Sequence, residues 1–357
     1  MQIVQFTNET KRIKDFLSLP KTLYRNNDNT EDSSTVKRLL LGEHALNKYF
    51  DLYKFVAYKN DQPVARFTIT IYPKDSTAYL GFYECIDDDR VARGIFKEAE
   101  RYAKTLNCKT IIGPVDASFW VKYRLKINNF DRRPYTGEPY NKDYYLRQFQ
   151  DNGYSICDHY TSNQYRSAQY EYVNSEYLGK YEEFVKKGYE IRRLKPEEFN
   201  DRLKDLYKLL TALYSDFPIY KQISEADFIS VFSSYQIIIN PSMVKFGFKS
   251  GKMVGFFISI PNYHNDVYNI NLPKLFRIIK IKKSPDEYVM LYIGVDQKHH
   301  GLGRALVYSI IRELNQNKKS SIGALAHDGK VTQKYASDMI SDIYEYVLLK
   351  KQLNEKP

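Results

Sequence analysis

The sequence predicts an α/β protein, of mixed α+β type, built from two tandem copies of one unit. First, its 357 residues match the length of two domains of ~150–200 residues. Second, residues 56–70 (VAYKNDQPVARFTIT) match residues 246–260 (FGFKSGKMVGFFISI) at a constant offset of 190. Third, the offset grows to 210 further on, so the second copy carries an insertion of about twenty residues.

The elements of each copy follow from the hydrophobic pattern. Each matched segment predicts a strand, a polar turn (Asn60-Asp61 or Ser250-Gly251) and a longer strand, which together form a β-hairpin. A short apolar strand at 80–85 or 290–295 comes next, and a helical pattern follows it. Further strands contain Ile112-Gly113 and Ile322-Gly323. We therefore expect each copy to be a mostly antiparallel twisted sheet flanked by helices.

The break between the copies is expected in the polar stretch 167–188, which ends in Gly188. After it, YEIRRL predicts a new first strand, and PEEFNDRLKDLYKLLTALYS predicts an amphipathic helix. The predicted domains are therefore residues 1–170 and 186–357.

Composition predicts a soluble, globular, cytoplasmic protein. Hydrophobic residues make up 43% and charged residues 27% of the chain. No apolar run reaches the ~18 residues of a membrane span, and the N-terminus lacks the apolar region of a signal peptide. Three cysteines without paired spacing indicate neither a disulfide framework nor a thiolate metal site. The net charge of +11 suits an anionic ligand, but no RNP, KH or zinc-finger pattern accompanies it, so we do not expect nucleic acid.

One glycine-containing turn in the second copy predicts an anion site. The strand DEYVMLYIGVD leads into QKHHGLGRALVYSIIREL, so a helix begins directly after the turn. Gly301 and Gly303 allow close ligand approach, and the first amides of the helix point at one place. The corresponding segment of the first copy is CIDDDR, whose three carboxylates would cap a helix but repel phosphate. Only the second copy is therefore expected to bind a phosphorylated ligand.

At this turn the second copy resembles the GCN5-related N-acetyltransferase superfamily. The family motif [R/Q]-x-x-G-x-[G/A] corresponds to KHHGLG at 298–303, with Lys298 in place of Arg or Gln. The resemblance implies that the turn holds the pyrophosphate of acetyl-coenzyme A or another acyl-coenzyme A. It also implies that the splayed fourth strand contacts the pantetheine arm. The cofactor-binding residues implied are Ile293, Val295, Lys298, His299, His300, Gly301, Leu302, Gly303 and Arg304.

The same resemblance implies a general acid. An Asn-type cap followed seven residues later by a Tyr on the fourth helix is matched by Asp328 and Tyr335. In the family this Tyr commonly protonates the departing coenzyme A thiolate, so Tyr335 is the predicted acid; packing is the alternative. His327 follows the fifth strand and is a candidate base for the amine, although a polar loop histidine is the simpler interpretation. No metal ligand is expected.

The first copy resembles the N-terminal half of bacterial tandem acetyltransferase-like proteins, through GFYECIDD, IIGPV and PYNKDYYLRQFQDNGY. The leading hypothesis is an acyl-coenzyme A-dependent N-acyltransferase, with acetyl transfer to a primary amine of a small molecule or peptide. The degenerate first copy would shape the acceptor side. The alternatives are a Fem-like aminoacyl-tRNA-dependent transferase, which would not need the glycine turn, and a non-catalytic scaffold.

Two further segments stand out. The insertion predicts a basic amphipathic helix, with Leu272, Leu275, Phe276 and Ile279 on one face. It could cover the sheet, close over the acceptor, or dock an acidic carrier protein or anionic lipid. The aromatic and basic stretch 119–145 includes the single Trp, Trp120, and is interpreted as an interdomain wall beside the acceptor.

Overall fold

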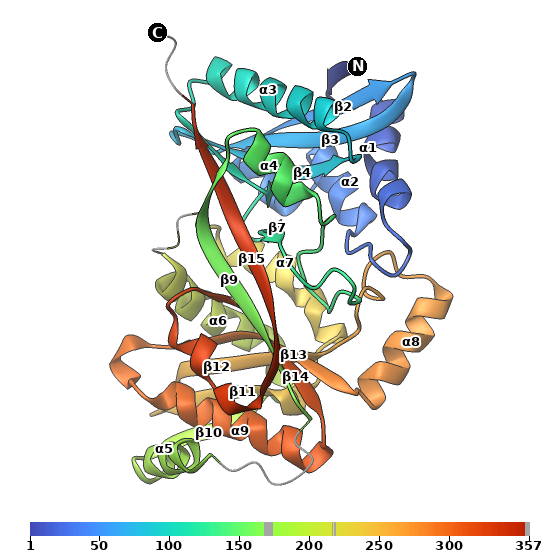
Figure 1. Ribbon diagram of the computed structural model, residues 1–357. Helices are drawn as coiled ribbons and strands as arrows, with labels where there is room; N and C mark the ends of the chain where they lie inside the picture. Colours follow the sequence, from blue (N-terminus) through green and yellow to red (C-terminus); the bar gives the residue numbers. More distant parts are fainter. Residues whose placement is uncertain (168–173, 216, 218, 354–357) are drawn as a thin grey trace. The chain divides into compact units, whose positions relative to one another are not determined.

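The computed structural model describes residues 1–167, 174–215, 217 and 219–353 (Figure 1). Part of the predicted break between the copies, residues 168–173, lies outside this set. The described chain forms two compact units, one from residues 1–160 and 345–353, the other from residues 161–344. Strands β9 (Ser155–Tyr165) and β15 (Ile340–Gln352) carry residues of both units. The units thus differ from the predicted ranges 1–170 and 186–357, because the last strand pairs in the first unit.

The first unit is built on a sheet in the order β1-β2-β3-β4-β5-β15. Neighbours from β1 to β4 are antiparallel, β4 and β5 are parallel, and β15 runs antiparallel to β5. Its strands before β9 are β1 (Gln2–Phe6), β2 (Asp51–Lys59), β3 (Gln62–Ile71), β4 (Thr77–Cys85), β5 (Thr110–Gly113), β6 (Val115–Asp116), β7 (Lys122–Tyr123) and β8 (Leu125–Lys126). Its helices are α1 (Thr10–Leu23), α2 (Ser33–Leu41), α3 (Asp89–Thr105) and α4 (Tyr145–Asp151).

The second unit repeats this plan in the strand order β10-β11-β12-β13-β14. The first three neighbouring pairs are antiparallel, and β13 and β14 are parallel. Its strands are β10 (Tyr189–Arg193), β11 (Val244–Lys249), β12 (Lys252–Pro261), β13 (Glu287–Val295) and β14 (Ser320–His327). Its helices are α5 (Ser175–Lys186), α6 (Phe199–Tyr214), α7 (Glu225–Phe232), α8 (Leu272–Lys283) and α9 (Leu302–Asn317). The tandem repeat and the mostly antiparallel fold predicted from the sequence are confirmed.

The two hairpins form for the same local reason. Asn60 and Asp61 join β2 to β3, and Ser250 and Gly251 join β11 to β12, all four with positive φ. Two consecutive residues with positive φ match the right-handed twist of the flanking strands, and Asn, Asp and Gly tolerate that backbone best. The polar turns therefore set the register of both hairpins.

One helix crosses between the parallel strands of each unit and buries its apolar stripe on the sheet. Helix α3 packs on β3 and β4 (Figure 1). Its side chains Ile95, Phe96 and Ala99 are fully buried. Helix α9 packs on β11, β12 and β13 with Leu306 and Ile310 buried in the core.

Among the described residues, no helix combines the length and the apolar character needed to cross a membrane.

Two local features differ from the sequence-based expectation. The polar break contains α5, which packs against α9 and buries Tyr177 and Phe184 in the core of the second unit. The prediction that Tyr335 lies on a helix is wrong, because the chain forms only a short 3₁₀ turn at Val331–Lys334, after which Tyr335 is extended. Two β-branched residues, Val331 and Thr332, disfavour a longer helix here.

Candidate functional site

Strand β13 separates from its parallel neighbour partway along its length. The pairing of β13 with β14 runs from Glu287 opposite Ser320 to Met290 opposite Gly323, whereas β13 itself continues to Val295. The register of β13 against β12 shifts at the same point, between Ile258 and Ser259. A bulge of this kind bends a strand away from its neighbour. Ile293 and Val295, both predicted to contact the pantetheine arm, lie on this separated segment and pair with β12 on its other side.

The predicted anion turn follows β13 directly and ends at the start of α9. Gly301 is the N-cap of α9 with a φ of 92°, a conformation that L side chains rarely adopt. It offers no side chain to the amides of the first turn. The Arg304 amide donates to the Gly301 carbonyl oxygen at 3.1 Å. The amides before it lie at the positive end of the helix dipole, which favours an anion.

The cations of the turn have different partners. Lys298 and His300 are exposed. The His299 imidazole Nδ1 lies 2.7 Å from the Tyr189 hydroxyl, so β10 holds this ring. Arg304 forms an ion pair with Glu176 of α5, Nε to Oε1 2.8 Å. The structure therefore keeps four basic side chains around one helix N-terminus, and two of them reach the solvent directly.

The structure brings Tyr335 to this turn, although not on a helix. A Cβ placed on Gly303 would lie 2.9 Å from the Tyr335 hydroxyl oxygen, which is too close for an ordinary contact. The hydroxyl can therefore occupy this position because residue 303 is a glycine. Tyr165 holds the backbone of Tyr335, its hydroxyl donating to the carbonyl oxygen at 2.9 Å. Tyr177 contacts the Tyr335 ring edge to face, with centroids 6.1 Å apart. Burial raises the pKa of Tyr335, with the Arg304 charge opposing, so the phenol keeps its proton at neutral pH.

His327 lies at the end of β14, where different contacts hold it. Its Nδ1 is 2.9 Å from the Asp328 carbonyl oxygen, and its ring meets Phe217 edge to face with centroids 5.5 Å apart. His264, at the start of the insertion, has a φ of 52°, and its backbone amide donates to the Asn262 side-chain oxygen at 3.0 Å. Like His327, His264 is a candidate base from the sequence, with a polar loop histidine as the simpler interpretation; both roles remain predictions.

The first unit fills the equivalent positions with its own chain. Asp88 caps α3 by accepting from the amides of Arg90 and Val91, and Arg147 pairs with Asp87 and Asp89. A helix end that is already occupied by carboxylates does not favour a phosphate.

Strand β4 pairs with β5 only from Thr77 to Tyr79 but continues to Cys85, and the chain itself fills the space beside this separated part. A Cβ on Gly81 would lie 2.0 Å from the Val115 carbonyl oxygen, so β6 packs directly against β4. The Phe82 amide, at a bulge with φ 47°, donates to the Asp116 carboxylate at 2.5 Å. The amide that the bulge exposes is therefore satisfied within the unit.

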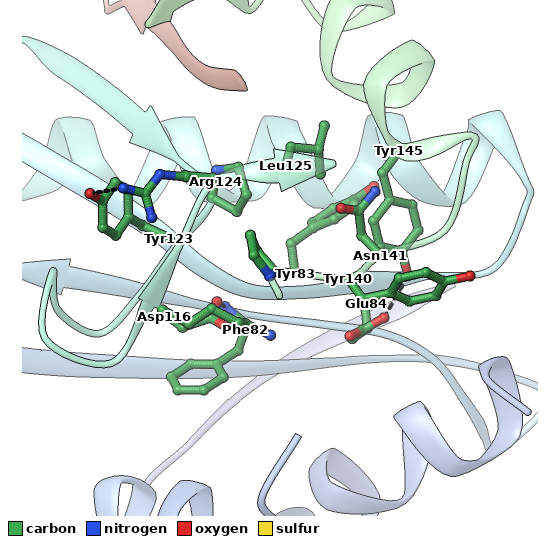
Figure 2. A pocket seen from close by; sticks show the side chains of 13 residues that line it. Phe82, Tyr83, Glu84, Asp116, Tyr123, Arg124, Leu125, Tyr140, Asn141 and Tyr145 are labelled. Carbon is green, nitrogen blue, oxygen red and sulfur yellow. Dashed lines mark hydrogen bonds and ion pairs between the residues drawn. The ribbon is translucent and has the colours of Figure 1, made fainter. Parts of the chain in front are cut away.

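Next to this bulge the first unit has a small polar pocket of about 30 Å³, room for roughly two waters (Figure 2). Part of the aromatic stretch 119–145 forms its wall. The pocket is lined, among others, by Glu84, Asp116, Lys122, Tyr140 and Tyr145.

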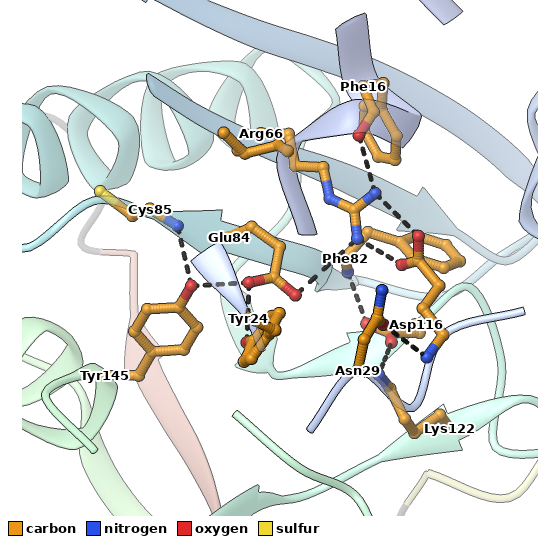
Figure 3. Close-up of polar contacts among 12 residues, drawn as sticks. Phe16, Tyr24, Asn29, Arg66, Phe82, Glu84, Cys85, Asp116, Lys122 and Tyr145 are labelled. Carbon is orange, nitrogen blue, oxygen red and sulfur yellow. Dashed lines mark hydrogen bonds and ion pairs between the residues drawn. The ribbon is translucent and has the colours of Figure 1, made fainter. Parts of the chain in front are cut away.

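A network of buried charges lies behind the pocket (Figure 3). Arg66 is 1% exposed and forms a bidentate ion pair with Glu31. Its guanidinium also donates to the Phe16 carbonyl oxygen at 2.9 Å. Its guanidinium is 3.8 Å from the Glu84 carboxylate. Tyr24 and Tyr145 both donate their hydroxyl protons to Glu84, at 2.8 and 2.6 Å. Burial raises the pKa of Glu84 to about 7, although the positive charge of Arg66 acts to lower this pKa.

Sequence reasoning missed this network. A sequence signal was present, because Arg66 and Glu84 are the only charged residues in two otherwise uncharged strand segments, VARFTIT and LGFYEC. A charged residue within a buried strand requires a partner. The partner Glu31 lies outside the repeated elements, so only the folded chain reveals the pairing.

Comparison with known proteins points to one fold. No protein-family model matches the sequence. Among curated proteins, the chain is similar to Protein YghO of Escherichia coli (strain K12), with 22% identity over 271 residues, 72% of this chain and 68% of YghO.

Three solved structures resemble the chain along almost its full length. A tandem GNAT protein from the clavulanic acid biosynthesis pathway has a TM-score of 0.54 at 8% identity, covering 100% of this chain and 99% of that one. A GCN5-related N-acetyltransferase from Anabaena variabilis has a TM-score of 0.54 at 7% identity, covering 99% and 73%. One from Sphaerobacter thermophilus has a TM-score of 0.50 at 10% identity, covering 99% and 97%. The chain therefore has the tandem fold of the GCN5-related N-acetyltransferases, which is the family that its sequence resembles.

Proposed function

We propose that the protein is an acyl-coenzyme A-dependent N-acyltransferase. The acyl group proposed is acetyl, and the acceptor is a primary amine of a small molecule or peptide. The observation that carries the proposal is the position of the Tyr335 hydroxyl against Gly303, at the N-terminus of α9. This position supports the proposal, because a glycine turn suited to an anion and a half-buried phenol that keeps its proton would then meet at the end of one separated strand.

The residues around this turn suit coenzyme A. Amides of residues 301–303 would hold the pyrophosphate, with Lys298 and Arg304 supplying positive charge and the His300 ring supplying a polar contact. Main-chain groups between residues 291 and 295, on the side of β13 that no longer pairs with β14, would contact the pantetheine arm. Bound there, the cofactor would supply an acyl thioester that an amine can attack.

Tyr335 would supply the proton of this reaction. When the amine nitrogen forms its bond to the acyl carbon and the carbon–sulfur bond breaks, the leaving sulfur needs a proton. The Tyr335 hydroxyl holds one at neutral pH because burial raises its pKa. The proton lost by the amine has no assigned acceptor; His327 is the candidate that the sequence suggested.

The first unit would contribute to the acceptor side without binding the cofactor. Its helix end is occupied by carboxylates, and its separated strand is filled by β6.

Calorimetric titration of the full chain with coenzyme A tests the binding site. We expect one site per chain, weakened at least roughly tenfold in Gly303→Ala, because a Cβ at 303 would narrow the turn in which the pyrophosphate is proposed to lie. Gly179→Ala on α5 is the matched control, because a Cβ there meets open space. Two equal sites, or Gly303→Ala binding like wild type, would contradict the proposal. Absence of coenzyme A binding would instead favour the aminoacyl-tRNA alternative.

A second experiment addresses Tyr335. Removing the phenol proton in Tyr335→Phe should lower kcat by roughly 10- to 10⁴-fold with little change in coenzyme A affinity. The readout is thiol release from acetyl-coenzyme A in the presence of a panel of primary amines. Unchanged turnover in the variant would assign Tyr335 to packing.

A further inference from the structure

Helix α8 is attached to its unit by one side only. Asn271 caps it by accepting from the Lys274 amide at 3.0 Å. Ile278 is its one fully buried side chain. Arg277 donates to both oxygens of the buried Asp266, at 3.0 and 2.7 Å. Lys274 reaches the Tyr268 carbonyl oxygen at 2.5 Å. Positions 274, 277 and 278 therefore define the face that packs on the protein.

The opposite face is apolar and faces solvent. Leu272, Leu275, Phe276 and Ile279 are 71%, 41%, 70% and 56% exposed. Their spacing of i, i+3, i+4 and i+7 places them in one stripe along the helix. Together with Ile270, they account for five of the twelve large hydrophobic side chains that are exposed in the described chain. Such clustering on a surface indicates an interaction site, whereas scattered exposed residues do not.

Positive charge accompanies this stripe. Residues 270–283 contain five basic residues and no acidic residue. Lys280 follows Phe276 by one helical turn, and Lys283 follows Ile279 by one turn; both are exposed. An apolar stripe bordered by lysines on a helix that lies on the surface is the pattern of a segment that binds in the membrane interface.

We propose that α8 docks the protein on the surface of an anionic lipid bilayer. The apolar stripe enters the boundary between headgroups and acyl chains, and Lys280 and Lys283 contact anionic headgroups. The stripe favours lipid over an acidic carrier protein, because a carrier matched to the lysines by charge alone would leave four large apolar side chains in water. The site is independent of the proposed acyl transfer, since its residues lie outside the glycine turn.

Flotation of the purified full chain with vesicles tests the docking. We expect strong binding to vesicles of phosphatidylcholine mixed with phosphatidylglycerol, weak binding to phosphatidylcholine alone, and a decline at high salt. Lys280→Gln with Lys283→Gln should lower the partition coefficient by roughly fivefold per lysine. Phe276→Ser with Ile279→Ser should abolish binding at every salt concentration. These side chains are exposed, so circular dichroism should show an unchanged fold.

Matched controls separate the helix from general surface properties. Val331→Ser removes an exposed apolar side chain elsewhere, and Lys97→Gln removes an exposed lysine of α3; both should bind vesicles like wild type. Phe276→Trp provides a direct readout, because its emission should shift to the blue on anionic vesicles. Failure of the wild type to float, flotation that survives Phe276→Ser with Ile279→Ser, or binding to a purified acidic carrier protein without binding to vesicles would overturn the proposal.

Discussion

The raised pKa of Glu84 predicts a specific dependence of stability on pH. The ordinary value for Glu is 4.5 and the folded value is about 7. Between these values the folded protein keeps the proton that the unfolded chain has lost, so the free energy of unfolding falls as pH rises. The difference between the two pKa values corresponds to about 3 kcal/mol in the free energy of unfolding. This stabilisation is fully present below about pH 4.5 and is lost above about pH 7.

Glu84→Gln should remove this dependence, because an amide has no proton to lose in this range. The amide oxygen can still accept from Tyr24 and Tyr145, and the repulsion between its NH₂ group and Arg66 does not change with pH. From about pH 4.5 to about pH 8, the stability difference between variant and wild type should therefore shift by about 3 kcal/mol in favour of the variant.

Urea unfolding followed by tryptophan fluorescence is the assay. Trp120 is the single Trp of the chain and lies in the first unit, so its emission reports on the unit that contains Glu84. Glu43→Gln, at an exposed position of the same unit, is the control and should follow the wild-type pH profile. Parallel pH profiles for Glu84→Gln and wild type would refute the assignment of the proton to Glu84.

Three further substitutions have expected outcomes. Lys126→Met removes the partner of Glu138 from a fully buried ion pair of 2.6 Å, and chemical denaturation should show a loss of roughly 3–5 kcal/mol. Phe55→Ala removes a ring stacked on Phe67 with centroids 4.6 Å apart, and the same measurement should show a loss of roughly 3–5 kcal/mol. Gly301→Ala forces a side chain onto a φ of 92°, which should cost roughly 1–2 kcal/mol and weaken coenzyme A binding in calorimetry.

Much of the fold could be predicted because its signals are local. The turns Asn60-Asp61 and Ser250-Gly251 specify two hairpins through backbone conformations that few residues tolerate. The glycine turn before α9 was recognisable for the same reason, since Gly301 occupies a conformation that L side chains rarely adopt. The roles assigned to the residues of this turn remain predictions until a ligand is bound.

Features that depend on distant contacts could not be predicted. Tyr335 reaches Gly303 through an extended segment held by Tyr165 and Tyr177, and a family spacing alone suggested a helix. In α5, only Tyr177 and Phe184 are buried, so the polar residues between them obscured its packing face.

The sequence by itself determined the tandem repeat, the hairpins, the basic insertion helix and the difference between a glycine turn and an acidic turn. These properties depend on residues that are close together in the chain, where backbone sterics and hydrophobic spacing are sufficient. Only the tertiary structure decided that β15 pairs with β5, that Arg66 meets Glu31 and Glu84, and that α8 turns its apolar stripe to solvent. Strand pairing and burial join residues far apart in the sequence, and local patterns cannot choose among such partners because their energies depend on the packing of the whole unit.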